Sequence, residues 1–314
     1  MPRGGAASRS CGTARSCAVI GAALSTRGEG WGRRSVRRPV DHHPFGPAPG
    51  PERPRFPLGN VTFSRRGRGI ARGAGPLRTA RTPTAPPLER QTLMKIGIIG
   101  AGNIGGNLTR RLTALGHKVS VANSRGPQTL TALAEETGAT PVTVGEAARG
   151  ARIVVVTIPL KAIPDLPAEG LFDGAAEGFA VIDTGNYYPR ERDGRIAGIE
   201  DEGLTESRWT ERHLGHPVVK AFNGTYAQDI LDRHRPAGDA ERLALPVAGD
   251  DEEAKKAVRE LIDELGFDTV DAGGIDDSWR QQPDTPVYGL RGGVEAVERA
   301  LAEASPERPA SFRG

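Results

Sequence analysis

The sequence predicts an α/β fold in which a doubly wound, mainly parallel sheet is followed by a small C-terminal helical cap. Two observations predict it. From residue 94 onward, short apolar runs rich in β-branched residues alternate with amphipathic stretches, as a parallel sheet covered by helices requires. The first run, residues 95–99, leads straight into a stretch with four glycines between residues 100 and 106 and then into a helical stripe.

The strands that we expect are short and apolar. They span residues 95–99, 118–122, 140–144, 152–157, 179–183, 218–222, 243–248 and 267–271. Because strands and helices alternate throughout, we expect one extended sheet. A long polar excursion separates the fifth and sixth strands, at residues 185–214.

The helices that we expect have apolar residues at helical spacing or clear boundary residues. They span residues 108–115, 130–136, 226–234, 250–265 and 289–304, with a helical turn at 145–149 and a short helix between Pro159 and Pro164. Gly116 and Gly138 end two of them. Residues 250–253 are all acidic and face the positive end of a helix dipole, which favours capping over metal binding.

The first 93 residues differ in composition from the rest. They contain 17 Arg, no Lys and four acidic residues, a net charge of +13, whereas residues 94–314 carry −10. A segment rich in Gly, Pro and Arg without apolar periodicity cannot offset its conformational entropy, so we expect disorder. Nucleic-acid binding or targeting is an alternative, but the abrupt first strand favours Met94 as the real start and the leader as a mis-assigned extension.

The glycine stretch is typical of a dinucleotide-binding turn of the Rossmann type. Gly100 allows the tight turn, Gly102 lets the backbone approach a pyrophosphate, and Gly105 lets the helix pack on the strand. The amides of the helix N-terminus then stabilise the anion. An ordinary strand-to-helix turn is the alternative. We therefore expect a dinucleotide-binding domain at residues 94–272 and the helical cap at residues 273–314.

The end of the second strand indicates NADP(H) as the cofactor. An NAD site carries Asp or Glu there to hold the ribose hydroxyls, whereas this chain has Asn123, Ser124 and Arg125. The serine hydroxyl and the guanidinium match the oxygens of a 2′-phosphate. A solvated loop arginine is the alternative reading of Arg125.

Residues 94–314 resemble the NADP oxidoreductases that depend on the deazaflavin coenzyme F420, whose relatives include the reductase domain of six-transmembrane metalloreductases. The resemblance is carried by residues 100–105, by Asn-Ser-Arg-Gly-Pro at 123–127, by Asp-Thr-Gly-Asn at 183–186, by residues 207–215 and by Val-Val-Lys-Ala-Phe-Asn at 218–223. It implies cofactor contacts at Gly100, Ala101, Gly102, Asn103, Ile104 and Gly105 for the pyrophosphate, at Asn123, Ser124 and Arg125 for the 2′-phosphate end, and at Ile158, Pro159, Asn186 and Ala221 toward the nicotinamide. No Lys follows closely after Arg125, so the grip on the 2′-phosphate rests on one guanidinium.

The resemblance implies direct hydride transfer between NADP(H) and coenzyme F420 or a flavin, which requires no catalytic side chain. Residues 273–289 are where the acceptor would be chosen, with Trp279 either an aromatic wall or core packing. If the acceptor is instead a carbonyl or imine metabolite, a proton donor is needed, and the candidates are Tyr187, Tyr188, Lys220 and His216. Lys220 pointing to solvent and His216 as a turn residue are the alternatives. A non-catalytic NADPH-binding sensor is the third hypothesis.

The remaining expectations concern partners and compartment. Both cysteines lie in the leader, which favours a reducing, cytoplasmic location, and no His or Cys pair has zinc spacing. No run approaches the roughly 18 apolar residues of a membrane-spanning helix. We expect a small-molecule acceptor, no metal, no nucleic acid at the folded part, and a homodimer.

Overall fold

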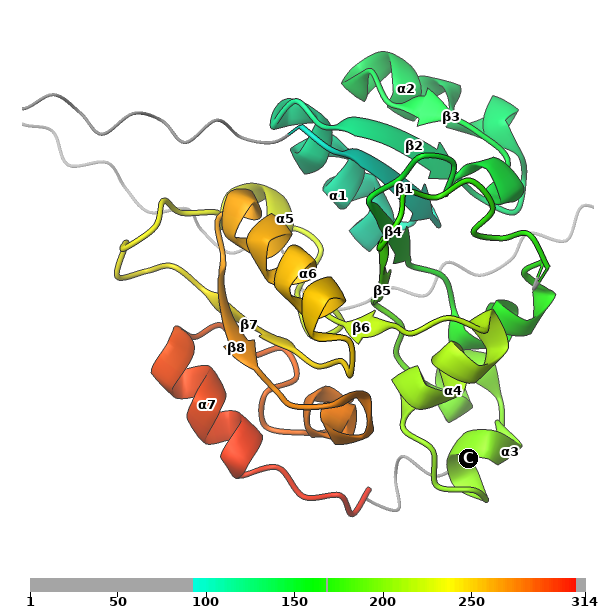
Figure 1. The fold of residues 1–314 in the computed structure, drawn as a ribbon. Coiled ribbons are helices and arrows are strands. Elements are labelled where there is room, and N and C mark those ends of the chain that lie inside the picture. Colours follow the sequence, from blue (N-terminus) through cyan, green and yellow to red (C-terminus); the bar gives the residue numbers. More distant parts are fainter. Residues whose placement is uncertain (1–92, 168, 309–314) are drawn as a thin grey trace, which may run out of the picture. The chain divides into compact units, whose positions relative to one another are not determined.

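The expected α/β fold is confirmed in the computed structural model, which describes residues 93–167 and 169–308 (Figure 1). The predictions for residues 1–92, disorder included, lie outside the described residues. The main sheet is parallel throughout, in the order β3-β2-β1-β4-β5-β6. Its strands are β1 (Lys95–Ile99), β2 (Lys118–Ala122), β3 (Thr140–Pro141), β4 (Ile153–Val156), β5 (Ala180–Asp183) and β6 (Val219–Lys220).

The central strand β1 lies between β2 and β4, with Ile98 opposite Val121 and Val155. Helices cover both faces of this sheet, which explains why its inner strands are continuous apolar runs. The chain order of the strands reverses between β1 and β4. In such sheets the ligand crevice lies outside the carboxyl ends of the strands at this reversal.

The helices expected from the sequence are present with changes in length, and two further helices form within residues 185–214, the stretch expected to be a polar excursion. They are α1 (Asn103–Ala114), α2 (Thr131–Thr137), α3 (Ala197–Glu200), α4 (Glu206–Leu214), α5 (Asp229–Asp232), α6 (Glu252–Leu265) and α7 (Val294–Ala302). Gly138 ends α2 in the left-handed conformation, as expected. Asp251 caps α6 by accepting hydrogen bonds from the Glu253 and Ala254 amides, each at 3.0 Å, which confirms the capping role. The helix predicted at residues 226–234 is only the single turn α5.

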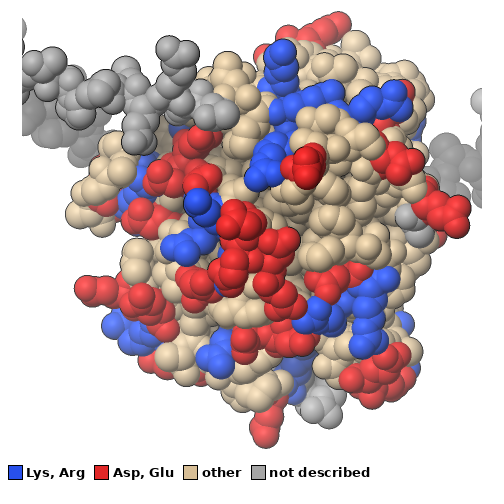
Figure 2. Space-filling view, viewed as in Figure 1, with Lys and Arg blue, Asp and Glu red and all other residues tan. Residues whose placement is uncertain are grey.

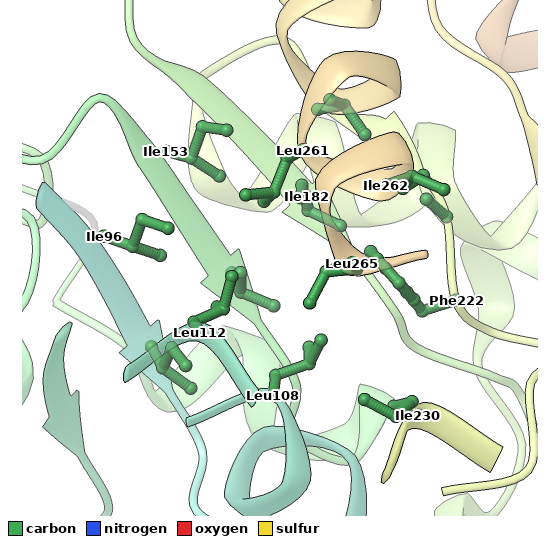
Figure 3. Packing of buried hydrophobic residues seen from close by; sticks show 14 of the residues in the cluster. Ile96, Leu108, Leu112, Ile153, Ile182, Phe222, Ile230, Leu261, Ile262 and Leu265 are labelled. Carbon is green, nitrogen blue, oxygen red and sulfur yellow. The ribbon is translucent and has the colours of Figure 1, made fainter. Parts of the chain in front are cut away.

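One face of the sheet is covered by α1, α5 and α6. Figure 3 shows Leu108 and Leu112 of α1, together with Leu261 and Leu265 of α6, among the strand side chains of this buried cluster. Each fully buried aliphatic side chain contributes about 1.5–3 kcal/mol relative to exposure. A second buried cluster on the opposite face includes Trp209 of α4. The sheet is therefore fixed from both sides, and its carboxyl edge is left for a ligand.

The prediction of one extended sheet is wrong. Strands β7 (Ala244–Val247) and β8 (Asp268–Asp271) form a separate two-stranded parallel sheet, joined to β6 only by an antiparallel bridge between Lys220 and Ala248. The strand β6 stops at Lys220, and Phe222 has a φ of +62°, which takes the chain out of the extended conformation. The helical cap α7 packs on this second sheet through Val297 and Leu301.

Candidate dinucleotide and acceptor site

The three glycines of the turn have different surroundings. A Cβ at Gly100, where φ is +114°, would lie 2.9 Å from Cγ2 of Ile158 and closer still to the Thr157 carbonyl. A Cβ at Gly105 would lie 2.7 Å from Cγ2 of Thr157 and would overlap the Gly100 carbonyl. A Cβ at Gly102 would meet nothing within 4 Å. Two positions are thus closed by packing and the middle one opens onto free space, the division of roles that a pyrophosphate turn requires.

The first turn of α1 offers backbone amides to an anion. Gly102 is the N-cap residue, and neither a capping side-chain hydrogen bond nor an acidic residue occupies this turn. Asn103 is exposed, and Ala101 and Ile104 are half-buried against the core. Since the first amides of a helix have no partner within the helix, this N-terminus has the hydrogen-bonding capacity for a phosphate.

The loop after β2 presents Ser124 and Arg125 to solvent. The Asn123 side chain shapes it: its Oδ1 accepts from the Arg125 amide at 3.0 Å, and its Nδ2 donates to Oγ1 of Thr129 at 2.9 Å. Both Ser124 and Arg125 are exposed. Among the described residues, no hydrogen bond or ion pair engages the Arg125 guanidinium, which can therefore receive a phosphate without losing a protein partner.

The loop after β4 borders the glycine turn. The Thr157 amide donates to the Ile99 carbonyl at 2.9 Å, which continues the pairing of β4 with β1. The next residues, Ile158 and Pro159, are half-buried at this carboxyl edge. These two apolar side chains therefore lie where the inner half of a dinucleotide would pass.

Two amides join the loops that follow β5 and β6. Nδ2 of Asn186 donates to the Asn223 carbonyl at 2.8 Å, and Nδ2 of Asn223 donates to Oδ1 of Asn186 at 3.1 Å. The Gln281 side chain, from the segment before α7, donates to Oδ1 of Asn223 at 3.0 Å. Asn186 is thus held at the carboxyl edge. Ala221, by contrast, is 0% exposed, so its methyl group contacts only protein.

Lys220 does not point to solvent. Its side chain is completely buried, and Nζ donates to the Gly185 carbonyl at 2.5 Å and lies 3.4 Å from Oδ2 of Asp183 and 3.7 Å from Oε2 of Glu206. Burial raises the pKa of the Glu206 carboxyl, and the nearby Lys220 and Arg308 act against that rise. Lys220 therefore ties the ends of β5 and β6 together and is shielded from any acceptor.

Tyr187 and His216 also lie away from the edge. The Tyr187 hydroxyl donates to Glu200 and accepts from the Ile196 amide at 3.0 Å, and burial raises the pKa of this phenol to about 12. The His216 ring packs 4.4 Å from the Phe179 ring and lies before β6, at the amino end of that strand. In a parallel sheet this is the edge opposite to the ligand crevice. The turn reading of His216 fits the structure better than the catalytic one.

The fold brings in Tyr288, which the sequence alone did not single out, and it joins Gln281, from the segment expected to choose the acceptor, to Asn223. The Tyr288 hydroxyl is hydrogen-bonded to the Tyr188 hydroxyl, and Nδ2 of Asn186 lies 3.5 Å away from it. No local motif marks either residue, because their partners lie far away in sequence. Trp279 is half-buried under the Arg280 guanidinium and lines a separate hollow of about 650 Å³ with Tyr187 and other residues.

The charged side chains of the visible face are mixed. Figure 2 shows acidic side chains gathered over α6, with Lys and Arg beside them. Within residues 93–167 and 169–308, no group of three His, Cys, Asp or Glu side chains is placed to hold a metal ion. In the same part of the chain, no helix has the length and apolar character needed to cross a bilayer.

Comparisons with known proteins agree with this geometry. Residues 95–187 match the family model described as NADP oxidoreductase coenzyme F420-dependent. The crystal structure of the hypothetical protein SMa0349 from Sinorhizobium meliloti is 28% identical with a TM-score of 0.53, over 63% of this chain and 94% of that one.

Two curated proteins match shorter segments. The Escherichia coli protein YjhV is 47% identical over 60 residues, which is 19% of this chain and 44% of that protein. Erythronate-4-phosphate dehydrogenase from Salinibacter ruber is 40% identical over 88 residues, 28% of this chain and 21% of that enzyme. The matches thus span less than half of either relative. Over residues 95–187, this chain is therefore similar to the NADP oxidoreductases that depend on coenzyme F420.

Proposed function

We propose that this protein is an enzyme that transfers a hydride between NADP(H) and a deazaflavin, coenzyme F420, or a flavin. One observation carries the cofactor part of the proposal. Packing closes the turn at Gly100 and Gly105, whereas the space beside Gly102 is open and adjoins an uncapped helix N-terminus. This arrangement fits a pyrophosphate, and the family model covers the same residues.

The preference for NADP(H) rests on the loop after β2. Its exposed Arg125 guanidinium and Ser124 hydroxyl can bind the 2′-phosphate, and no carboxylate stands at residues 123–125 to hold the ribose hydroxyls of NAD. The bound cofactor supplies the hydride from its nicotinamide ring. The protein's part is to hold the ring beside Ile158 and Pro159, with the acceptor near Asn186.

The acceptor is the less constrained part. The anionic tail of a deazaflavin requires basic residues near the cleft, and the sequence offers chiefly four: Lys161, Arg190, Arg280 and Arg291. Each of these cations already has a partner. Nζ of Lys161 donates to the Arg192 carbonyl at 2.7 Å, and Arg291 forms a two-point pair with Asp229. Arg280 lies 4.0 Å from Asp277, and Arg190 also has a partner. An anionic tail bound by any of these four cations would therefore have to share the cation with that partner.

A second candidate function is reduction of a small carbonyl or imine compound. It is favoured by the hydrogen-bonded hydroxyls of Tyr188 and Tyr288 at the carboxyl edge, because such a reduction needs a proton donor. Hydride transfer to a flavin-like ring depends less on a proton donor from the protein. Both candidates use the same cofactor site.

The test follows the loss of NADPH absorbance in the full-length protein. The acceptors offered are oxidised coenzyme F420, flavin mononucleotide, a cyclic imine and an aldehyde. Turnover with either ring compound supports the leading proposal, and turnover confined to the imine or aldehyde supports the second candidate. Tight NADPH binding without turnover on any of the four would overturn both.

The proposal includes a homodimer. The side chains of Tyr226, Leu290 and Val294 are large, apolar and exposed by 53%, 36% and 37%. Covering them would lower the free energy by about 25 cal/mol for each Å² of apolar surface. Light scattering on the purified chain measures the assembly mass, and a monomer at every concentration would contradict this part.

A further inference from the structure

We propose that Tyr288 donates the proton that accompanies hydride transfer, and that Tyr188 is the residue that positions it. The inference rests on the proposed function and deepens it, since it assigns a proton donor to the same site. It selects acceptors in which a ring nitrogen, an imine nitrogen or a carbonyl oxygen is protonated as the neighbouring carbon is reduced.

The two phenols meet from distant parts of the chain. Tyr188 lies on the loop after β5 and Tyr288 on the segment before α7, 100 positions later, and their hydroxyls are hydrogen-bonded. Both side chains are half-buried, so they retain access to a ligand. The pair is therefore created by the fold at the edge where the acceptor is expected.

The hydrogen bonds leave the Tyr288 proton available. The Asn186 amide is fixed as a donor, because its Nδ2 donates to the Asn223 carbonyl at 2.8 Å and lies 3.5 Å from the Tyr288 oxygen. Either hydroxyl can donate in the tyrosine pair, and when Tyr188 donates, the Tyr288 oxygen accepts through both lone pairs. Its own O–H can then point only to a group outside this network, which is the acceptor.

The surrounding backbone holds Tyr288 against the β6 loop. A Cβ at Gly224 would lie 3.6 Å from Cα and Cδ2 of Tyr288, an ordinary van der Waals distance, so Tyr288 packs beside this loop. Phe222, two residues earlier, is 2% exposed and keeps a left-handed φ of +62°. Such a conformation is strained in a non-glycine residue and is concentrated at functional sites. The strain supports a functional role for this loop.

Burial keeps the Tyr188 hydroxyl protonated by raising its pKa. Burial, and then the hydrogen bond with Tyr288, raises the pKa of the Tyr188 phenol, with a smaller rise from Glu206. The Arg192 guanidinium, 5.0 Å from the ring centroid and paired with Asp193, acts in the other direction. The net direction is upward, so Tyr188 remains a donor at neutral pH.

The proton balance is complete. A hydride and its electron pair go to the electrophilic carbon of the acceptor, and the π electrons of that C=N or C=O bond move to the heteroatom. The heteroatom takes the proton of the Tyr288 hydroxyl. The resulting phenolate recovers a proton from Tyr188, which in turn is reprotonated by water.

The variants that test the pair are Tyr288→Phe and Tyr188→Phe, with Tyr226→Phe as the matched control because Tyr226 is exposed and outside the pair. With the best acceptor of the wild type, we expect Tyr288→Phe to lower kcat about 100-fold or more. Tyr188→Phe should lower it about three- to tenfold, since one hydrogen bond to the donor is lost. In wild type, heavy water should slow the reaction, and in Tyr288→Phe this solvent effect should disappear.

Two further readouts are independent of turnover. NADPH affinity, from the fluorescence of the bound cofactor, should be unchanged in all three variants, which excludes misfolding. The chain has four tyrosines, so tyrosinate absorbance can be titrated, and Tyr288→Phe should lower the pKa of Tyr188 because it loses the bond that raises it. If Tyr288→Phe turns over at the wild-type rate, or if the pKa of Tyr188 is the same in Tyr288→Phe as in the wild type, the inference is overturned and the proposed function is not. Absence of turnover in the wild type would overturn it together with the proposed function.

Discussion

The Lys220 ammonium and the Asp183 carboxylate form a buried ion pair, 3.4 Å apart, at the adjoining ends of β6 and β5. The two side chains are 0% and 1% exposed. Asp183 also accepts from Oγ of Ser207 at 2.6 Å and, through its other oxygen, from the Gly185 amide at 2.8 Å. The pair therefore fixes the start of the loop that carries Asn186.

Removing the lysine should destabilise the protein strongly. Lys220→Met leaves the buried Asp183 without its cation, which costs about 3–5 kcal/mol of the free energy of unfolding. Lys256→Met is the control, because Lys256 is exposed and its replacement should cost less than about 0.5 kcal/mol. Urea unfolding measures both, and equal costs would contradict the structural role of Lys220.

The pH dependence of stability should report Glu206. Burial raises its pKa above the ordinary 4.5, so the folded state binds this proton more tightly than the unfolded state does. The stabilisation is complete below pH 4.5 and is lost as the pH rises through the folded-state pKa. Glu206→Gln has no proton to lose, so its stability relative to wild type should increase as the pH rises from 4.5 through the folded-state pKa of Glu206. Urea unfolding across this range checks the sign, and a flat or falling difference would contradict it.

Substitutions at two glycines of the turn should have different effects, one on stability and the other on NADPH binding. Gly105→Ala places a methyl against the Gly100 carbonyl and Thr157, and overpacking of this kind costs about 1–3 kcal/mol. Gly102→Ala meets no protein atom, so it should unfold like the wild type but weaken NADPH binding at least about tenfold by filling the pyrophosphate space. Thermal unfolding and fluorescence titration measure the two effects. Tight NADPH binding by Gly102→Ala would place the pyrophosphate elsewhere.

Arg125→Ala should weaken NADPH binding selectively. Hydrogen bonds to a charged group are worth about 1.5–3 kcal/mol, so the Kd for NADPH should rise about 10- to 100-fold. The Kd for NADH should barely change. Arg149→Ala, at another exposed arginine, should leave both unaffected. Parallel titrations with the two dinucleotides give the comparison, and an equal loss for both would remove Arg125 from the phosphate site.

Local pattern was sufficient to predict much of the main sheet. The strands β1, β2 and β4 are apolar runs followed by glycine or a loop residue, and a short window of sequence contains that information. The separate β7–β8 sheet was not predictable in this way. Local sequence does not specify which strand is the pairing partner of β7 or β8, because candidate partners lie far apart in the chain.

The candidate site shows the same difference between local sequence features and contacts that only the fold creates. The glycine turn and Arg125 are local features, so the sequence alone indicated them. Lys220 was misread because its two carboxylate partners, Asp183 and Glu206, are brought to it by the fold. Tyr288 was missed for the same reason, since its partner Tyr188 lies 100 positions away.

The most direct test of the proposed function is to follow the hydrogen itself. NADPH deuterated at one face of C4 is mixed with the full-length protein and each acceptor that is reduced at a carbon atom, namely coenzyme F420, the cyclic imine and the aldehyde, and the reduced acceptor is analysed by mass spectrometry. The flavin is left out because the hydrogen that it receives on N5 exchanges with water. We expect deuterium from one face only to appear on the carbon of the reduced acceptor, because the protein holds the nicotinamide in a single orientation. Reduced product without deuterium from either face, or no reduced product despite NADPH binding, would contradict direct hydride transfer.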